Sequence, residues 1–185
     1  MATIRRRSVF DRYAVTEKYL YARAKALTLR PNSLGIKLSH DTQVYGAVID
    51  MPMGPSTLGT LVCLANGTAN LYLNNGNSVA GEASKYRSVA NAARSAVASF
   101  RQILPSCERV IEYDLPVSNT YYVYLLTKKG IYKMSYDPSK LNVMIADETV
   151  RTGRFAHFLI QQVMKELSAA QMKDKAAVAK HEKQE

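Results

Sequence analysis

Three arginines recur at intervals of seven residues, at Arg87, Arg94 and Arg101. On an α-helix this spacing places the three side chains along one side, and each arginine directly follows an apolar residue. Guanidinium groups bind phosphates and carboxylates through paired hydrogen bonds, so the row predicts a contact surface for an anionic partner. The alternative is structural, because long arginine stems also pack at the border of a buried stripe while their charged ends stay in water.

A second basic group, Arg5, Arg6 and Arg7, lies near the start of the chain. The whole sequence has 25 Lys and Arg against 15 Asp and Glu, a net charge of +10. Residues 1–30 contain 8 basic and 2 acidic side chains, whereas residues 31–150 contain 10 and 9. The basicity is concentrated toward the ends, where it predicts either contact with phosphate, on nucleic acid or an acidic lipid surface, or a solubilising role.

No spacing of chemically active residues predicts a catalytic, metal or cofactor site. Residues 54–60 have glycines at the separation of a phosphate-binding loop, but they lack its lysine and precede a strand-like segment. The three histidines, at positions 40, 157 and 181, are too widely separated to form a metal-binding motif. A small enzyme assembled from separated residues such as Ser78, His40 or Glu112 stays open as an alternative, because sequence spacing does not reveal such a site.

Tyrosine is abundant, with 12 residues in a chain that has no tryptophan. Tyr121, Tyr122 and Tyr124 lie on one predicted strand, and they place aromatic rings on both of its faces. Exposed tyrosines are typical of protein interfaces, and they also stack on nucleic-acid bases. These three residues therefore predict an interface without indicating which class of partner it binds.

The elements that position these residues follow from hydrophobic periodicity. Apolar residues at helical intervals predict helices over 9–29, 83–104 and 155–170. Runs of β-branched and aromatic residues predict strands over 44–51, 58–65, 68–73, 109–115, 121–127 and 131–136, while residues 76–81 are predicted to form a turn. The predicted fold is α+β: an antiparallel sheet of about five to six strands, with a long middle helix and N- and C-terminal helices packed on it.

The length of 185 residues suits one domain with a single core. We expect a basic arm over 1–8, one domain over 9–170 and a charged tail over 171–185 that frays. No segment approaches the roughly 20 apolar residues of a membrane span. The two cysteines, at positions 63 and 107, are expected to be reduced thiols. Together these features predict a cytoplasmic protein.

The order of elements resembles that of the roadblock/LC7-like proteins, and longin- and profilin-like domains share much of it. The resemblance rests on the hairpin that turns at Asn66-Gly67, then Val79-Ala80-Gly81, the long middle helix, and the strands and helix that follow. It covers residues 58–170, and the strand over 44–51 is additional. The resemblance implies a non-enzymatic dimer that docks small GTPases or motor components, with the middle helix and its neighbouring strand forming the dimer contact.

Three functional hypotheses follow. The first is a non-enzymatic, homo-oligomeric interaction or scaffold module that binds itself and another protein, without a cofactor. The second is a nucleic-acid-binding accessory protein that uses the basic arm and the arginine row. The third is a small enzyme of unknown reaction. A dimer that persists at high salt favours the first hypothesis, and binding that weakens steeply with salt favours the second.

Overall fold

The fold is built on one antiparallel sheet of seven strands. The computed structural model describes residues 9–81, 85–142 and 147–181. The strands follow the order β4-β3-β2-β1-β6-β7-β5 across the sheet, and every neighbouring pair is antiparallel. Their bounds are β1 Gly46–Pro52, β2 Leu58–Leu64, β3 Ala69–Leu73, β4 Ser78–Gly81, β5 Glu108–Val110, β6 Tyr121–Thr127 and β7 Gly130–Tyr136.

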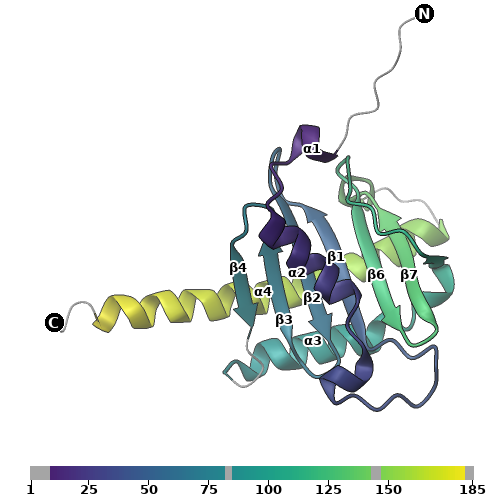
Figure 1. The fold of residues 1–185 in the computed structure, drawn as a ribbon, viewed down its shortest axis with the longest axis horizontal. Coiled ribbons are helices and arrows are strands. Elements are labelled where there is room, and N and C mark those ends of the chain that lie inside the picture. The colour runs from purple at the N-terminus through teal and green to yellow at the C-terminus, as the bar shows by residue number, and fades with distance from the viewer. Residues whose placement is uncertain (1–8, 82–84, 143–146, 182–185) are drawn as a thin grey trace, which may run out of the picture.

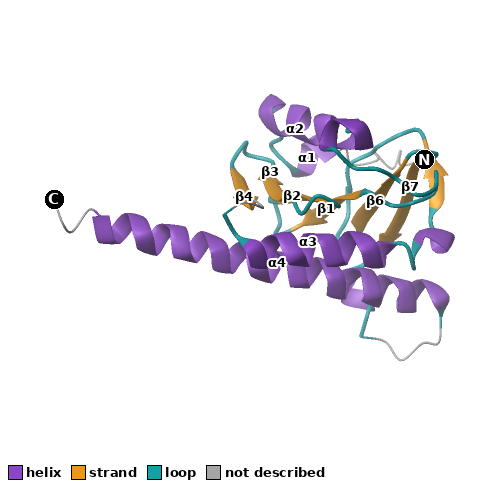
Figure 2. Cartoon of the chain, turned by 90° about the horizontal axis from the view of Figure 1, so that it is seen from below, coloured by secondary structure: helices purple, strands orange, loops and turns teal. Residues whose placement is uncertain are grey.

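The helices lie on both faces of the sheet. On one face α3 (Arg87–Phe100) and α4 (Glu148–His181) lie side by side, and α2 (Glu17–Leu27) covers the other face (Figures 1 and 2). A short helix α1 (Val9–Arg12) precedes α2, and three single-turn 3₁₀ helices, Pro31–Leu34, Leu104–Ser106 and Pro138–Lys140, lie in the connections. The predicted α+β class is confirmed, with a strand count slightly above the expected five to six.

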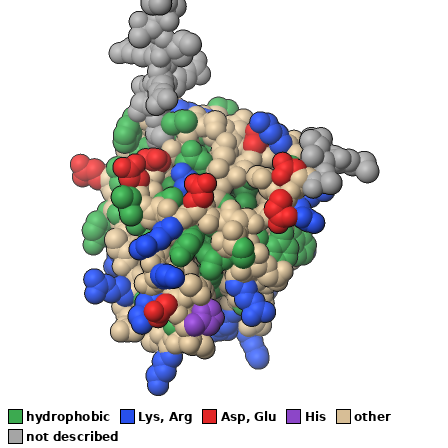
Figure 3. All heavy atoms as spheres, turned by 90° about the vertical axis from the view of Figure 1, so that its right-hand side faces the viewer, with side chains coloured by type: hydrophobic (Ala, Val, Ile, Leu, Met, Phe, Trp, Pro, Cys, Tyr) green, Lys and Arg blue, Asp and Glu red, His purple; other side chains and the backbone are tan. Residues whose placement is uncertain are grey.

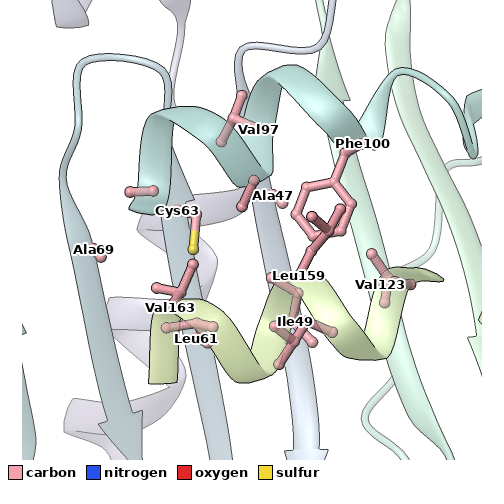
Figure 4. Packing of buried hydrophobic residues seen from close by; sticks show 14 of the residues in the cluster. Ala47, Ile49, Leu61, Cys63, Ala69, Val97, Phe100, Val123, Leu159 and Val163 are labelled. Carbon is pink, nitrogen blue, oxygen red and sulfur yellow. The ribbon is translucent and has the colours of Figure 1, made fainter. Parts of the chain in front are cut away.

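The larger core lies between the sheet and the pair α3 and α4. Figure 4 shows Phe100 of α3 close to Leu159 of α4, with Ile49 of β1 beneath them. The apolar stripe that predicted the middle helix is buried in this core, since Ala93, Val97 and Phe100 are almost inaccessible to solvent. Periodicity located this helix because all its buried residues meet a single surface.

A second core lies between the sheet and α2. Val48 of β1 and Val62 of β2 pack there against Ala26 and Leu27 of α2. The two central strands are therefore buried on both faces, and all seven residues of β2 are inaccessible. This explains why these strands read in the sequence as continuous apolar runs rather than as alternating patterns.

The predicted single helix over 9–29 is wrong, because residues 13–16 are not helical and separate α1 from α2. The backbone N–H of Thr16 donates to the carbonyl of Asn74 at 2.9 Å, so a distant residue replaces the helical acceptor. The hydroxyl of Thr16 then accepts from the backbone N–H of Tyr19 and caps α2. Tyr13 lies in this non-helical segment, and its side chain is buried in a small third core beside Leu58.

Residues 76–81 were expected to form a turn, but Ser78–Gly81 form the edge strand β4, which pairs with β3. The strand predicted over 109–115 is shorter than expected, since β5 ends at Val110. The hairpin at Asn66-Gly67 is confirmed, and Gly67 has the positive φ of 97° that such a turn favours.

The C-terminal helix α4 is longer than its predicted apolar stripe and includes most of the expected tail. Its 34 residues correspond to about 51 Å, whereas seven strands at their usual spacing form a sheet about 29 Å wide. The helix starts near β7, crosses the strands and extends past β4 (Figures 1 and 2). Within the described residues, no helix has both the length and the apolar character of a membrane span.

Candidate functional site

Two arginines of the predicted row, Arg87 and Arg94, lie on the exposed face of α3, and the third, Arg101, directly follows its last residue. Arg87, Arg94 and Arg101 are all exposed, and the sequence of α3 contains no acidic residue. Seven helical residues correspond to about 10.5 Å, so the row is about 21 Å long. The other exposed side chains of this face are small or neutral: Ser88, Asn91, Ser95, Ala98 and Gln102.

The members of the row differ in their contacts. The guanidinium of Arg94 donates to the backbone carbonyl of Asn66 at 2.9 Å and lies against Gly67, so it joins α3 to the β2–β3 turn. Arg87 and Arg101 form no hydrogen bond or ion pair within the described part of the chain. These two guanidinium groups are therefore available for a partner. Arg5, Arg6 and Arg7 lie outside the described residues.

The predicted interface tyrosines are largely used within the fold. Tyr124 is fully buried, and its hydroxyl donates to the carbonyl of Asp114 at 2.7 Å. Burial raises the pKa of Tyr124 well above its usual value, and the negative charge of Asp50 raises it further. Tyr122 is half-buried, with the ammonium of Lys133 3.7 Å from its ring centre.

Tyr121 lies on the opposite face of the same strand. Its ring is half-buried and packs against those of Tyr136 and His157, at 5.5 and 5.8 Å between ring centres. The three tyrosines thus pack against other parts of the fold on both faces of β6. Of these three tyrosines, Tyr121 and Tyr122 are partly exposed, and a partner could contact only their exposed parts.

A buried ion pair that sequence analysis did not identify links α2 to the centre of the sheet. Arg23 of α2 and Asp50 of β1 are both inaccessible, and their closest nitrogen and oxygen atoms are 2.7 Å apart. Burial disfavours the charged guanidinium, but the charge and hydrogen bonds of Asp50, together with Tyr124 and Tyr19, outweigh that effect and raise the pKa of Arg23. An acidic residue inside a wholly apolar strand was the available signal, because such a charge requires a partner.

The surrounding groups satisfy this pair. Thr60 donates its hydroxyl to Asp50 at 2.6 Å, so the hydroxyl of Tyr19 must donate to Thr60 at 2.7 Å. Arg23 also donates to the backbone carbonyls of Tyr113 and Asp114, at 2.9 and 3.0 Å. The network therefore fixes α2 and the segment after β5 on the sheet. Both charged side chains are buried, so the network stabilises the contact between α2 and the sheet.

The residues of the hypothetical dispersed enzyme do not converge. Ser78 lies on β4 at one end of the strand order, and Glu112 follows β5 at the other end. His40 lies in the loop before β1, where its ring contacts the hydroxyl of Thr42. Across the residues that the structure covers, no three His, Cys, Asp or Glu side chains lie close enough together to hold a metal ion.

The two edges of the sheet differ in charge. β5, at one edge, contains Glu108 and Arg109, and that side of the molecule has interspersed acidic and basic side chains (Figure 3). β4, at the other edge, has no charged residue and no proline, and it has no strand partner on its outer side within the described chain. Charged edges resist pairing with other strands, so β4 is the edge that is open to pairing.

The helix α4 passes over β4 and is attached beside it. The carboxylate of Asp174 on α4 lies 2.6 Å from the ammonium of Lys85 and also accepts from the hydroxyl of Tyr86. Both partners lie in the segment that connects β4 to α3. The helical residues 175–181 extend beyond this attachment (Figure 1). The open strand edge and the extending helix thus lie on the same side of the molecule.

Comparisons with known proteins gave no match: no family model, no curated protein and no solved structure is significantly similar to this chain. The resemblance to roadblock/LC7-like proteins stays a prediction from the order of elements.

Proposed function

We propose that this protein is a non-enzymatic, homo-oligomeric interaction module in which a second copy pairs with the β4 edge. The observation that carries the proposal is the coincidence of an open, uncharged edge strand with a helix that extends past it. Unpaired backbone N–H and C=O groups on such an edge are ready to bind another strand. The most direct partner is β4 of a second copy, in an antiparallel pair related by a twofold axis.

A four-residue strand is too short to hold a dimer alone, since stable interfaces bury about 1,600 Å² in total. The end of α4 supplies further surface, because it extends in the direction in which a second copy would continue the sheet. Met172 is 71% exposed there, and Ala176 and Ala177 are also exposed. Small and apolar side chains on a helix allow close packing against a second helix.

The proposal is tested by light scattering after gel filtration of three variants. Ser78→Lys places a charged side chain on the edge strand of each copy, which opposes strand pairing, and removal of residues 175–185 shortens α4. Each change is expected to weaken dimerisation by about tenfold or more. Ser135→Lys, at an exposed position of β7 away from this edge, is the matched control and should leave the dimer intact. Equal dimer stability in all three variants would rule out the β4 interface.

We further propose that the protein is cytoplasmic and that it binds another protein. Both cysteines are free thiols, which suits the reducing cytoplasm. The partner class implied by the roadblock/LC7-like resemblance, small GTPases or motor components, is proposed from the order of elements alone.

A second candidate function is binding of nucleic acid along α3, favoured by the acid-free face and the two unpaired guanidinium groups. Successive arginines of the row are about 10.5 Å apart, which corresponds to about three nucleotide steps of a B-form strand.

The triple variant R87A/R94A/R101A should lose affinity for a fluorescent oligonucleotide. The slope of its log affinity against log salt concentration should become shallower by about two to three. The control K18A/K25A/R30A removes equal charge on the α2 side. Equal losses in both triple variants would contradict a specific role for α3.

A further inference from the structure

A cleft of about 630 Å³ lies between the loop before β1 and the C-terminal part of α3. This volume is within the range of small-molecule sites, about 300 to 1,000 Å³. The cleft brings together two residues that the sequence singled out separately, His40 and Arg101. The other lining residues that bear on a ligand are Gln43, Val44, Val97, Ala98 and Leu104.

The lining combines apolar side chains with hydrogen-bond donors. Val44 and Val97 are buried members of the larger core and form the floor of the cleft, so its accessible apolar surface comes mainly from Leu104, which is half-buried, and Ala98, which is exposed. Arg101 is exposed at the side of the cleft and has no hydrogen bond or ion pair within the described chain. A ligand with one apolar part and one anionic group matches this distribution.

The loop's internal hydrogen bonds leave donors available. The side-chain oxygen of Gln43 accepts from the backbone N–H of Ser39 at 2.7 Å, so the two N–H groups of its amide remain for a ligand. His40 uses Nδ1 in its 3.0 Å contact with Thr42, which leaves Nε2. The amide of Gln43 thus adds neutral donors to the charge of Arg101, and Nε2 of His40 is a donor as well in the tautomer whose Nδ1 accepts from Thr42.

Among the described residues, no acidic side chain lines the cleft. The nearest acidic residue in the sequence, Asp41, is paired with Lys128 at 2.9 Å and accepts the backbone N–H of Lys129 through its carbonyl. Its charge is therefore compensated at the β6–β7 turn.

The C-terminal end of α3, which borders the cleft, carries the negative end of the helix dipole and therefore repels an anion. Backbone hydrogen bonds to the last carbonyls of the helix reduce this repulsion. The carbonyls of Ser99 and Phe100 accept the backbone N–H groups of Gln102 and Ile103, at 3.0 and 3.1 Å. The full charge of Arg101 then exceeds the remaining partial charge of the helix end.

We propose that this cleft binds a small organic anion, with its carboxylate or phosphate on Arg101 and its apolar body against Leu104 and Ala98, above the buried Val44 and Val97. The inference is independent of dimerisation through β4, because the cleft and that edge involve different residues.

The test is a nuclear magnetic resonance titration of the ¹⁵N-labelled full chain with benzoate, phenyl phosphate and inorganic phosphate. We expect saturable shifts confined to residues 39–44 and 97–104. At least one aromatic anion should bind about tenfold more tightly than inorganic phosphate, because only the aromatic ligands reach the apolar surface. The relative affinities of benzoate and phenyl phosphate identify which anionic group the cleft prefers.

Two variants and one control complete the test. Arg101→Gln should weaken binding by about tenfold or more. Ala98→Leu fills the cleft while retaining every charge, and it should weaken the aromatic ligands similarly. Arg87→Gln removes the same charge from the same face of α3 at its other end, and it should have no effect. Equal binding of inorganic phosphate and both aromatic anions, or equal losses in R101Q and R87Q, would show nonspecific ion binding and overturn the proposal.

Discussion

At the scale of single residues, the buried pair Arg23 and Asp50 is expected to matter most for stability. Asp50→Asn leaves the guanidinium of Arg23 buried without its counter-ion, and such changes lower the free energy of unfolding by about 3 to 5 kcal/mol. Asp41→Asn disrupts the exposed pair with Lys128 and should lower it by less than about 1 kcal/mol. Urea denaturation of the two variants measures both values.

The same experiment extends to the double variant R23M/D50L. Replacing both charges by apolar side chains of similar size removes the desolvation penalty of each ion, so this protein should be more stable than D50N. A double variant that is less stable than D50N would show that Arg23 stabilises the protein mainly through its hydrogen bonds to the carbonyls of Tyr113 and Asp114.

Two buried tyrosines are expected to respond oppositely to loss of the hydroxyl group. The hydroxyl of Tyr13 is buried and has no hydrogen-bond partner among the described residues, so Tyr13→Phe should raise the free energy of unfolding by about 1 kcal/mol. The hydroxyl of Tyr19 bonds to Thr60, so Tyr19→Phe should lower it by about the same amount. Thermal unfolding of both variants is the measurement. Destabilisation by Tyr13→Phe would mean that this hydroxyl has a partner in solution.

Buried tyrosines also predict how stability changes at alkaline pH. Burial raises the pKa of Tyr19, Tyr124 and Tyr136 well above the usual value of 10.0. In the unfolded chain these phenols lose their protons near pH 10, whereas in the folded protein they keep them. Their contribution to stability is therefore complete below pH 10 and is lost as the pH rises through the folded pKa values.

Tyrosinate absorbance and circular dichroism, recorded together against pH, measure this effect. The three buried tyrosines should ionise only as the circular dichroism signal is lost. Ionisation of all 12 tyrosines near pH 10, with the secondary structure unchanged, would contradict the assigned burial.

At the scale of elements, Asn74 is expected to hold the connection between α1 and α2 on the sheet. Its amide donates to the carbonyls of Ala14 and Ser56 and accepts from the N–H of Leu58, all within 3.1 Å. Asn74→Ala leaves these buried groups unpaired and should lower the free energy of unfolding by about 2 kcal/mol. The neighbouring Asn75 is exposed, so Asn75→Ala should have a much smaller effect.

Hydrogen exchange identifies where the Asn74→Ala variant loosens. The amide of Thr16, which donates to the carbonyl of Asn74, should exchange faster in the variant, while amides of β1 and β2 keep their protection. Uniformly faster exchange would instead indicate a general loss of stability.

The sequence predicted elements well where local periodicity matches a single packing surface. The middle helix and the hairpin at Asn66-Gly67 are of this kind. The break between α1 and α2 depends on Asn74, which is 58 residues from Thr16, so no local pattern indicated it. The sequence predicts a turn at β4 because its four residues show little alternation of apolar and polar side chains. Its extended conformation is determined by pairing with β3.

The candidate sites were predictable to a similar degree. Helical spacing placed the three arginines on one exposed face, as the structure also has them. The cleft was not predictable, because it joins residues 39–44 to the end of α3 through the fold rather than through a motif. The Arg23–Asp50 network likewise forms between residues 27 positions apart, although a lone acid in an apolar strand hinted at it.

At the scale of the whole molecule, net charge separates the two candidate functions. A chain with a net charge of +10 repels its own copies, so salt should leave a dimer unchanged or strengthen it. Binding of nucleic acid responds in the opposite direction, because salt competes for the phosphate contacts.

The most direct measurement is the absolute mass of the purified chain by light scattering after gel filtration, at low and high salt, with ultraviolet absorbance recorded. We expect twice the chain mass of 20.6 kDa at both salt concentrations, with no nucleic acid in the peak. A peak of 20.6 kDa at protein concentrations on the order of tens of micromolar would contradict the proposed homo-oligomer. A monomer that releases nucleic acid at high salt would support the arginine row of α3 as the functional surface instead.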